Sequence, residues 1–175
     1  SPLSIDADSR TARVAITGPL SPKGPSPIAR FFGFEGSSYQ EIAAAIETAT
    51  TSPEVRVIRL QMDTPGGSVR GMDSVRGAVE AAQEEGKTVV AENHGLIASA
   101  GYYIATAADR IEAIAPTVQT GSIGVILAGI DPSKAMEKIG LRRVRIVSSN
   151  APNKAPDPAT EEGTATLQAE VDALE

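Results

Sequence analysis

The sequence predicts an α/β fold with a largely parallel sheet buried between helices. Apolar, β-rich stretches alternate along the chain with stretches of helical periodicity, the order typical of parallel strands joined by helices. The chain is 41% hydrophobic and 3% aromatic with no Trp, so Ala, Val, Ile and Leu must build the core. Its 175 residues suit a single domain over 1–175. The last residues continue a helical pattern, and we expect the chain to be truncated at its C-terminus.

A strand, a long loop and a helix are expected first. Residues 12–17 alternate and are β-rich, which indicates a strand. Residues 18–38 are crowded with Pro, Gly and Ser and predict a flexible loop. This loop contains the apolar run "IARFFGF" with all three Phe of the chain, which indicates a surface for a partner or substrate. Ser38 and Glu41 have the spacing of a capping box and open the helix that follows.

The rest of the chain alternates strands and helices, placed by apolar periodicity and by glycine and proline signals. In the helix over 131–140, Asp131 is the expected N-cap, Pro132 the first residue and Gly140 the stop. The expected elements are a strand over 54–62, a helix over 69–86, a strand over 87–93, a helix after Ser99, strands over 110–115, 121–129 and 142–149, a Pro-rich loop over 150–160 and a helix from about 161.

Composition excludes several classes of function. A net charge of −6 argues against a nucleic-acid surface, which needs clustered Lys and Arg. The absence of cysteine excludes disulfides, thiolate metal sites and a cysteine nucleophile. No apolar run approaches the roughly 18 residues of a membrane span, and no signal-peptide pattern opens the chain. The run "DTPGGSVRG" matches neither a dinucleotide-binding fingerprint nor a P-loop. We expect no metal and no cofactor.

Ser99 lies between two alanines where a strand is expected to give way to a helix. A serine hydroxyl attacks a carbonyl only with a base to take its proton and amide donors to bind the oxyanion. At a strand-to-helix junction, the N–H of Ala100 can be one such donor. The simpler interpretation is a helix N-cap, and both interpretations stay open.

The run "MDTPGGSV" ends the strand over 54–62 with Pro65, Gly66 and Gly67. Adjacent glycines let a backbone approach a ligand closely and direct its N–H groups outward. In this interpretation Gly67 supplies a second oxyanion donor; losing one such donor typically costs ~3 kcal/mol of transition-state stabilisation. An ordinary strand-to-helix turn is the alternative.

The base is expected to be a lysine. His94 is the one histidine, and it precedes Ser99 by only five residues, whereas a catalytic histidine usually comes from a different loop. A lysine can serve if burial lowers its pKa from ~10.4 toward neutrality. Lys154 stands out because prolines flank it on both sides and no Asp or Glu lies within two residues. A solvated loop lysine is the alternative interpretation.

Four runs in this order resemble peptidase family S49: "MDTPGGSV", "SAGYYIATAADRIEA", "TGSIGVI" and a lysine after "RIVSS". The resemblance covers roughly residues 12–175. It implies a ClpP/crotonase-like fold built from ββα units, with Ser99 as nucleophile, Lys154 as general base and oxyanion donors at Gly67 and Ala100. Gly66 and Ser122 are supporting residues in this scheme, with Ser122 assisting the lysine and also a rival nucleophile.

The resemblance also implies a function. We expect a serine endopeptidase of protein or peptide substrates, of the phage prohead (capsid maturation) type, because "SAG" and "MDTPGG" are closer to the phage branch of the family. Alternatives are a signal peptide peptidase, a crotonase-like acyl-thioester enzyme and an inactive assembly protein. A homo-oligomer is expected, in the form of a ring with sites shared between protomers. The expected location is the cytoplasm or a procapsid, with the periphery of a membrane as the alternative.

Overall fold

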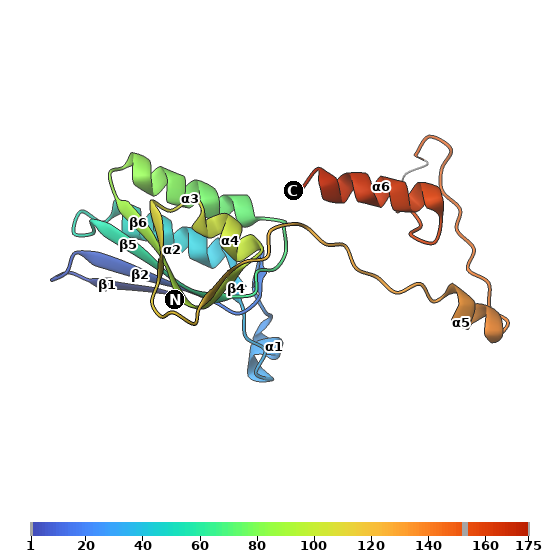
Figure 1. Cartoon of the computed structure of the whole chain (residues 1–175), viewed down its shortest axis with the longest axis horizontal. Helices are drawn as coiled ribbons and strands as arrows, with labels where there is room; N and C mark the ends of the chain where they lie inside the picture. The colour runs from blue at the N-terminus through green and yellow to red at the C-terminus, as the bar shows by residue number, and fades with distance from the viewer. Residues whose placement is uncertain (1, 152–153, 175) are drawn as a thin grey trace. The chain divides into compact units, whose positions relative to one another are not determined.

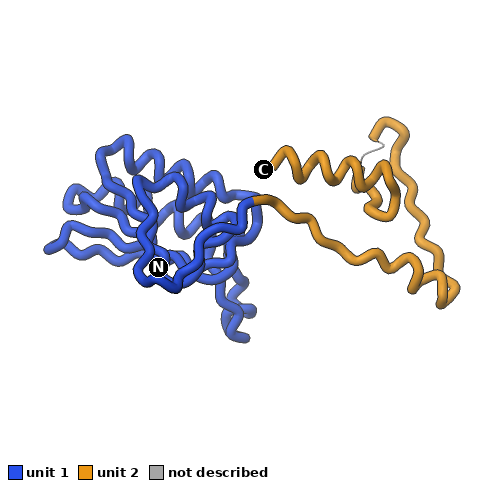
Figure 2. Tube along the Cα trace, in the orientation of Figure 1, with its two compact units in different colours: residues 1–123 blue, residues 124–175 orange. Residues whose placement is uncertain are grey.

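The computed structural model describes residues 2–151 and 154–174. The chain divides into two compact units, residues 1–123 and 124–175 (Figure 2). The first unit contains the sheet and five of the six candidate residues, and the second contains Lys154. The single domain over 1–175 stays a prediction.

The first unit is built on a sheet whose order is β1-β2-β5-β6-β7, with β8 also paired to β6 (Figure 1). Only β1 runs antiparallel to its neighbour among the described strands of this sheet, and the other pairings are parallel. The strands are β1 (Leu3–Asp6), β2 (Thr11–Thr17), β5 (Val57–Thr64), β6 (Thr88–Ala98), β7 (Arg110–Ala113) and β8 (Gln119–Gly121). This confirms the mostly parallel sheet.

Two helices, α2 (Tyr39–Thr51) and α3 (Met72–Glu84), lie side by side against one face of this sheet (Figure 1). The alternation of β5 explains why: Ile58, Leu60 and Met62 are buried on the helix side. The predicted cap of α2 is confirmed, because the Ser38 side chain accepts a hydrogen bond from the Glu41 N–H at 3.3 Å. The short helix α4 (Ala100–Ala105) follows β6 directly.

The predicted loop over 18–38 is mostly irregular but contains three short elements. These are β3 (Leu20–Ser21), α1 (Pro27–Phe31) and β4 (Ser37–Ser38), and β3 pairs with β4 in parallel. All three phenylalanines of the loop are exposed, as expected for a contact surface rather than a core.

The second unit contains α5 (Ser133–Lys138) and α6 (Glu161–Asp172), which confirms both predicted helices. Pro132 takes the N-cap position of α5 in place of Asp131, whose carboxylate instead accepts from the Ser133 N–H at 2.9 Å. In the described residues of this unit no helix or strand forms over 142–149. The strand predicted there was wrong, because a strand forms only with a partner and this segment has none.

Two further strand boundaries differ from prediction. The strand predicted over 87–93 continues to Ala98, because β6 leaves β7 after Asn93 and pairs with β8 from Leu96 onward. The strand predicted over 121–129 was wrong, because β8 covers Gln119–Gly121 and residues 122–129 form no strand. The apolar Ile123 and Ile126 of this segment are exposed. No helix in the described ranges has the length and apolarity that crossing a bilayer demands.

Candidate active site

Three neighbouring parallel strands end at one edge of the sheet, and the candidate residues follow them. Thr64 of β5 pairs with Ile97 of β6, and Ala98 of β6 pairs with Gly121 of β8. The glycine loop after β5, Ser99 after β6 and Ser122 after β8 therefore lie at the carboxyl edge, where ligands of α/β sheets bind. The structure thus brings together Gly66, Gly67, Ser99, Ala100 and Ser122.

Ser99 has a backbone conformation that side-chain-bearing residues rarely adopt, with φ 52° and ψ −124°. Such a conformation costs roughly 1–3 kcal/mol and persists only where the surroundings impose it. Here the Ser99 N–H donates to the Gly121 carbonyl at 3.1 Å, and the Ser99 carbonyl accepts from the Tyr103 N–H at 3.0 Å. The strained turn is therefore fixed from both sides.

The hydroxyl of Ser99 does not act as a helix cap. Ser99 occupies the N-cap position of α4, yet its side chain makes no capping hydrogen bond. The N-cap interpretation of this serine therefore does not explain its place in the sequence. Among the described residues, its oxygen has no hydrogen-bond partner.

Gly66 and Gly67 lie where no other residue fits. Gly66 has φ +89°, and a Cβ there would lie 2.6 Å from the Ala98 carbonyl oxygen and 2.7 Å from Ser99 Cβ. A Cβ on Gly67 would lie 2.0 Å from the Leu20 carbonyl oxygen. The loop can pass between β3 and Ser99 only because both residues lack a side chain.

Backbone hydrogen bonds with β3 and one side-chain bond hold this loop. The Leu20 N–H donates to the Gly66 carbonyl at 2.8 Å, and the Ser68 N–H donates to the Leu20 carbonyl at 2.9 Å. The buried Thr64 hydroxyl accepts from the Gly66 N–H at 3.0 Å. Within the described part of the chain, the Gly67 N–H between these anchors has no acceptor.

Ala100 presents a second amide, close to Gly66. It is the first residue of α4, so its N–H has no partner inside the helix. The backbone nitrogen of Ala100 is also among the atoms that a Cβ on Gly66 would approach, at 3.0 Å. Two amides without acceptors in the described residues, those of Gly67 and Ala100, therefore accompany Ser99. Such a pair of donors can stabilise a developing oxyanion.

Ser122 lies at the end of β8, directly after the Gly121 whose carbonyl binds the Ser99 N–H. It is exposed and has φ 56°, so two serines in left-handed conformations follow adjacent strands. This placement suits the predicted supporting role of Ser122, which stays a prediction.

Lys154 lies in the second unit, where it is exposed. Its N–H donates to the Ala151 carbonyl at 3.1 Å, and its carbonyl accepts from the Arg145 guanidinium. Pro152 and Asn153, which precede it in the predicted base segment, lie outside the described residues. Its role as the base stays a prediction.

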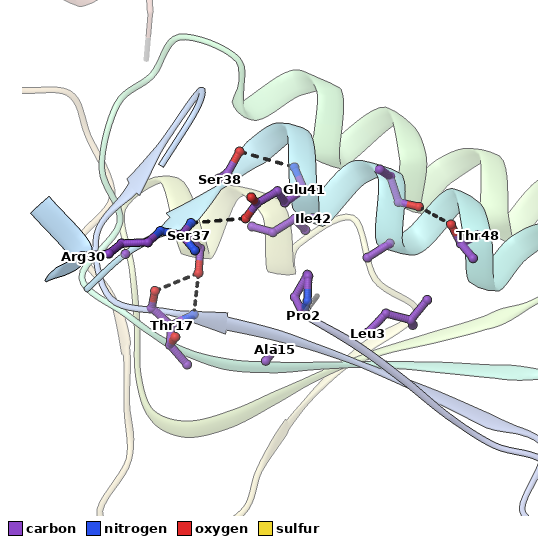
Figure 3. Close-up of a pocket in the computed structure, with 13 residues that line it drawn as sticks. Pro2, Leu3, Ala15, Thr17, Arg30, Ser37, Ser38, Glu41, Ile42 and Thr48 are labelled. Carbon is purple, nitrogen blue, oxygen red and sulfur yellow. Dashed lines mark hydrogen bonds and ion pairs between the residues drawn. The ribbon is translucent and has the colours of Figure 1, made fainter. Parts of the chain in front are cut away.

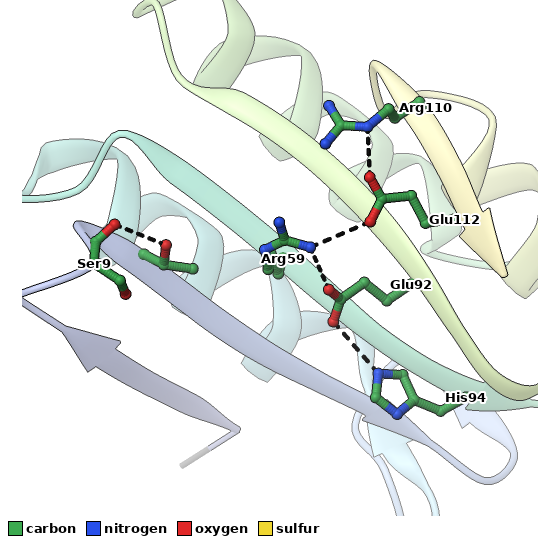
Figure 4. Close-up of polar contacts among 7 residues, drawn as sticks. Ser9, Arg59, Glu92, His94, Arg110 and Glu112 are labelled. Carbon is green, nitrogen blue, oxygen red and sulfur yellow. Dashed lines mark hydrogen bonds and ion pairs between the residues drawn. The ribbon is translucent and has the colours of Figure 1, made fainter. Parts of the chain in front are cut away.

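His94 belongs to a charged cluster on β5, β6 and β7 (Figure 4). Its Nε2 lies 3.4 Å from a carboxylate oxygen of Glu92, which also pairs with Arg59. Arg59 in turn lies 3.3 Å from Glu112. Burial raises the pKa of Glu92, but hydrogen bonds from Arg59 and His94 outweigh it and leave that pKa below its usual value. The imidazole thus lies within hydrogen-bonding distance of Glu92 in this cluster.

Asn93 is a structural residue of the site that sequence reasoning missed. It is fully buried, and its Nδ2 donates to the Gln119 carbonyl at 2.7 Å and to the Thr120 hydroxyl at 2.8 Å. It thereby fastens β8 beside β6 at the level where both strands approach Ser99. Asparagine is depleted in strands, so an Asn at the end of the strand predicted over 87–93 was the available signal.

A cavity of about 620 Å³ lies against β1, β2 and α2 (Figure 3). Its walls include Thr17 and Ser37, joined by a 2.8 Å hydrogen bond, and the ion pair of Arg30 and Glu41. None of the six candidate residues lines it. It is therefore separate from the Ser99 site.

Sequence comparisons relate the chain to known peptidases. A profile of peptidase family S49 matches residues 81–175, more than half of the chain. Protease 4 of Salmonella typhi is 42% identical over 83 residues, covering 47% of this chain and 13% of that protein. Capsid assembly protease C of Escherichia phage lambda is 35% identical over 143 residues, which cover 78% of this chain and 31% of that protein. The chloroplastic serine protease SPPA of Arabidopsis thaliana is 32% identical over 131 residues, which cover 75% of this chain and 18% of that protein.

Solved structures agree on the fold. An enoyl-CoA hydratase/isomerase family member has a TM-score of 0.51 at 19% identity, over 80% of this chain and 52% of that one. A mutant membrane-bound stomatin-specific protease in complex with a substrate peptide has a TM-score of 0.50 at 22% identity, over 66% of this chain and 45% of that one. These similarities confirm the ClpP/crotonase-like fold. The chain spans less than a third of the length of each curated relative named above. With more than half of its residues matched by the family profile, this chain belongs to peptidase family S49.

Proposed function

We propose that the protein is a serine endopeptidase in which Ser99 is the nucleophile and Lys154 the general base. One observation carries the proposal: Ser99 is held at φ 52° next to the glycine loop, and its hydroxyl makes no capping hydrogen bond, while the N–H groups of Gly67 and Ala100 have no acceptor in the described residues. A strained serine with two adjacent amide donors is the arrangement that acyl transfer requires.

In the proposed reaction, the neutral amine of Lys154 takes the proton of Ser99 Oγ as this oxygen attacks the carbonyl carbon of the scissile bond. The Gly67 and Ala100 N–H groups bind the oxyanion of the tetrahedral intermediate. The intermediate collapses when the C–N bond breaks and the leaving amine takes the proton from the lysine. Water, deprotonated by the same lysine, then hydrolyses the acyl-enzyme and restores both side chains.

Elimination supports a lysine as the base. The chain has no cysteine, and no histidine follows Ser99 in the sequence. The single histidine, His94, is engaged with Glu92. Lys154 is set among prolines at the place where the family resemblance puts its base.

Similarity to the phage capsid assembly protease supports a protein substrate and a role in capsid maturation. Similarity to signal peptide peptidases supports the alternative of cleaving peptides released from a membrane. A third candidate follows from the enoyl-CoA hydratase fold, because the same two amides could bind an enolate. A fluorophosphonate separates this candidate from the other two, since it labels only an activated serine.

A homo-oligomer is part of the proposal, with the exposed phenylalanines of the loop over 18–38 in the contact between protomers. Phe31 is 84% exposed, Phe32 70% and Phe34 67%. Exposed apolar side chains gathered in one short segment are typical of an interaction surface. A ring with sites shared between protomers is the form we expect.

The function is tested by incubating fluorescein-labelled casein with the wild type and four variants. Ser99→Ala, Lys154→Ala and Lys154→Arg are expected to abolish release of labelled peptides, since guanidinium keeps its proton and cannot replace a neutral amine. Lys134→Ala, a matched change to an exposed lysine of the second unit, is expected to retain activity. Full activity in Ser99→Ala would refute the proposal.

A further inference from the structure

Tyr39 is the one aromatic residue in the buried core of the described chain, and its hydroxyl bonds to a residue outside its own helix. It begins α2, is 1% exposed, and donates a 2.6 Å hydrogen bond to the Ser68 carbonyl. Packing alone does not need that hydroxyl, since a Phe ring would fill the same space. The role of the hydroxyl must therefore lie in its hydrogen bond to the Ser68 carbonyl.

Three successive peptide groups, which begin at the carbonyls of Gly66, Gly67 and Ser68, are each held by one hydrogen bond. The Ser68 carbonyl belongs to the third. In the first, the Gly66 carbonyl accepts from the Leu20 N–H at 2.8 Å. Because a trans peptide directs its C=O and N–H to opposite sides, the Gly67 N–H points away from Leu20. In the second, the Ser68 N–H donates to Leu20 at 2.9 Å, and in the third the Ser68 carbonyl accepts from Tyr39.

We infer that Tyr39 is a positioning residue of the oxyanion site, whose hydroxyl closes the loop over 66–68 so that the Gly67 N–H stays directed at the reacting carbonyl. This inference rests on the proposed function. The loop needs this anchor because glycine is the most flexible residue and two occur in succession there. Nothing of α2 contacts the substrate in this scheme, so Tyr39 acts through the loop alone.

Two observations agree with a fixed hydrogen-bond donor. Burial raises the pKa of Tyr39 to about 12, so the hydroxyl keeps its proton throughout the range in which a peptidase is assayed. The Tyr39 ring also lies near Gly71, just after the loop, where a Cβ would be 3.4 Å from Tyr39 Cδ2. The ring is therefore placed against the segment that follows the loop, while its hydroxyl holds Ser68.

The test compares Tyr39→Phe with Ile46→Val, a conservative change to a fully buried residue of the same helix. Both variants lose some stability, but only Tyr39→Phe removes the anchor of the loop. In casein cleavage, Tyr39→Phe is expected to lower kcat about tenfold with KM within about twofold of the wild type. Inhibition by a peptide aldehyde, whose hemiacetal oxygen occupies the oxyanion position, is expected to weaken by a similar factor. Ile46→Val is expected to match the wild type in both.

Amide hydrogen exchange supplies a readout that needs no activity. In Tyr39→Phe, exchange over residues 65–71 is expected to accelerate about tenfold while Ile46→Val leaves it unchanged. Wild-type kcat in Tyr39→Phe, or unchanged exchange in this segment, would overturn the inference. If every variant and the wild type fail to cleave casein or bind the aldehyde, the peptidase proposal fails, and the exchange result still shows separately whether Tyr39 holds the loop.

Discussion

Ser99, the proposed nucleophile, is held in a backbone conformation that costs stability. Its φ of 52° and ψ of −124° lie in a region that glycine visits freely and other residues avoid. The Gly121 carbonyl and the Tyr103 N–H hold the backbone there, and the side chain gains no capping hydrogen bond in return. Strain without local compensation is typical of functional positions.

This strain predicts that Ser99→Gly is more stable than Ser99→Ala, with a free energy of unfolding higher by about 1 kcal/mol. Glycine relieves the backbone strain, and the gain exceeds its larger entropy in the unfolded chain. Both variants are inactive. Urea denaturation of the two variants measures the difference, and an alanine variant at least as stable as the glycine variant would contradict the account.

At the scale of elements, local patterns predicted most of the first unit. Capping at Ser38 gave α2, and the alternation of β5 gave a strand with one buried face. The extension of β6 to Ala98 could not be read from its sequence, because it depends on β8, which pairs with β6 from more than 20 residues further along. The segment over 142–149 failed for the same reason, since its β-rich sequence lacks a partner strand. The position of Ser99 between a strand and a helix could be predicted from the runs around it, whereas the roles of Asn93 and Tyr39 depend on contacts distant in sequence.

The charged cluster of β5, β6 and β7 predicts a pH dependence of stability. The pKa of Glu92 is lowered in the folded protein, so its ion pair with Arg59 stabilises the fold above the ordinary pKa of 4.5 and is lost as pH falls through the folded value. Glu92→Gln is expected to cost about 1–2 kcal/mol at pH 7 and progressively less as pH falls below 4.5.

The pH effect is measured by urea denaturation of Glu92→Gln across pH 3–7. Glu112→Gln is the matched control, because Glu112 also pairs with Arg59 but its side chain is more exposed, at 38% against 13%. A smaller loss of stability is expected for Glu112→Gln. An equal loss of stability for Glu92→Gln at pH 3 and pH 7 would show that the ion pair is not the cause.

At the scale of the whole molecule, the proposed nucleophile and the proposed contact surface lie on different segments of the first unit. The strand ends of the first unit carry Ser99 and its amide donors, whereas the loop over 18–38 carries the exposed phenylalanines. β3, within that loop, also forms the hydrogen bonds that hold Gly66 and Ser68. A contact between protomers through this loop would therefore bear directly on the segment that positions the oxyanion donors.

Replacing Phe31 and Phe34 with serine is expected to shift the protein toward monomer in sedimentation velocity. Both side chains are largely exposed, so the free energy of unfolding of the double variant is expected to change by less than about 0.5 kcal/mol. Ile114→Ser, a change to an exposed apolar residue elsewhere on the first unit, is expected to leave assembly unchanged. A wild-type sedimentation coefficient for the double variant would exclude this loop from the contact.

The most direct measurement is the site and rate of covalent modification by a fluorophosphonate. Mass spectrometry of the labelled, digested protein is expected to find the adduct on Ser99 alone, formed faster as pH rises while the lysine amine loses its proton. Lys154→Ala is expected to lose this labelling. An adduct on Ser122, or unmodified Ser99 in the wild type, would contradict the account.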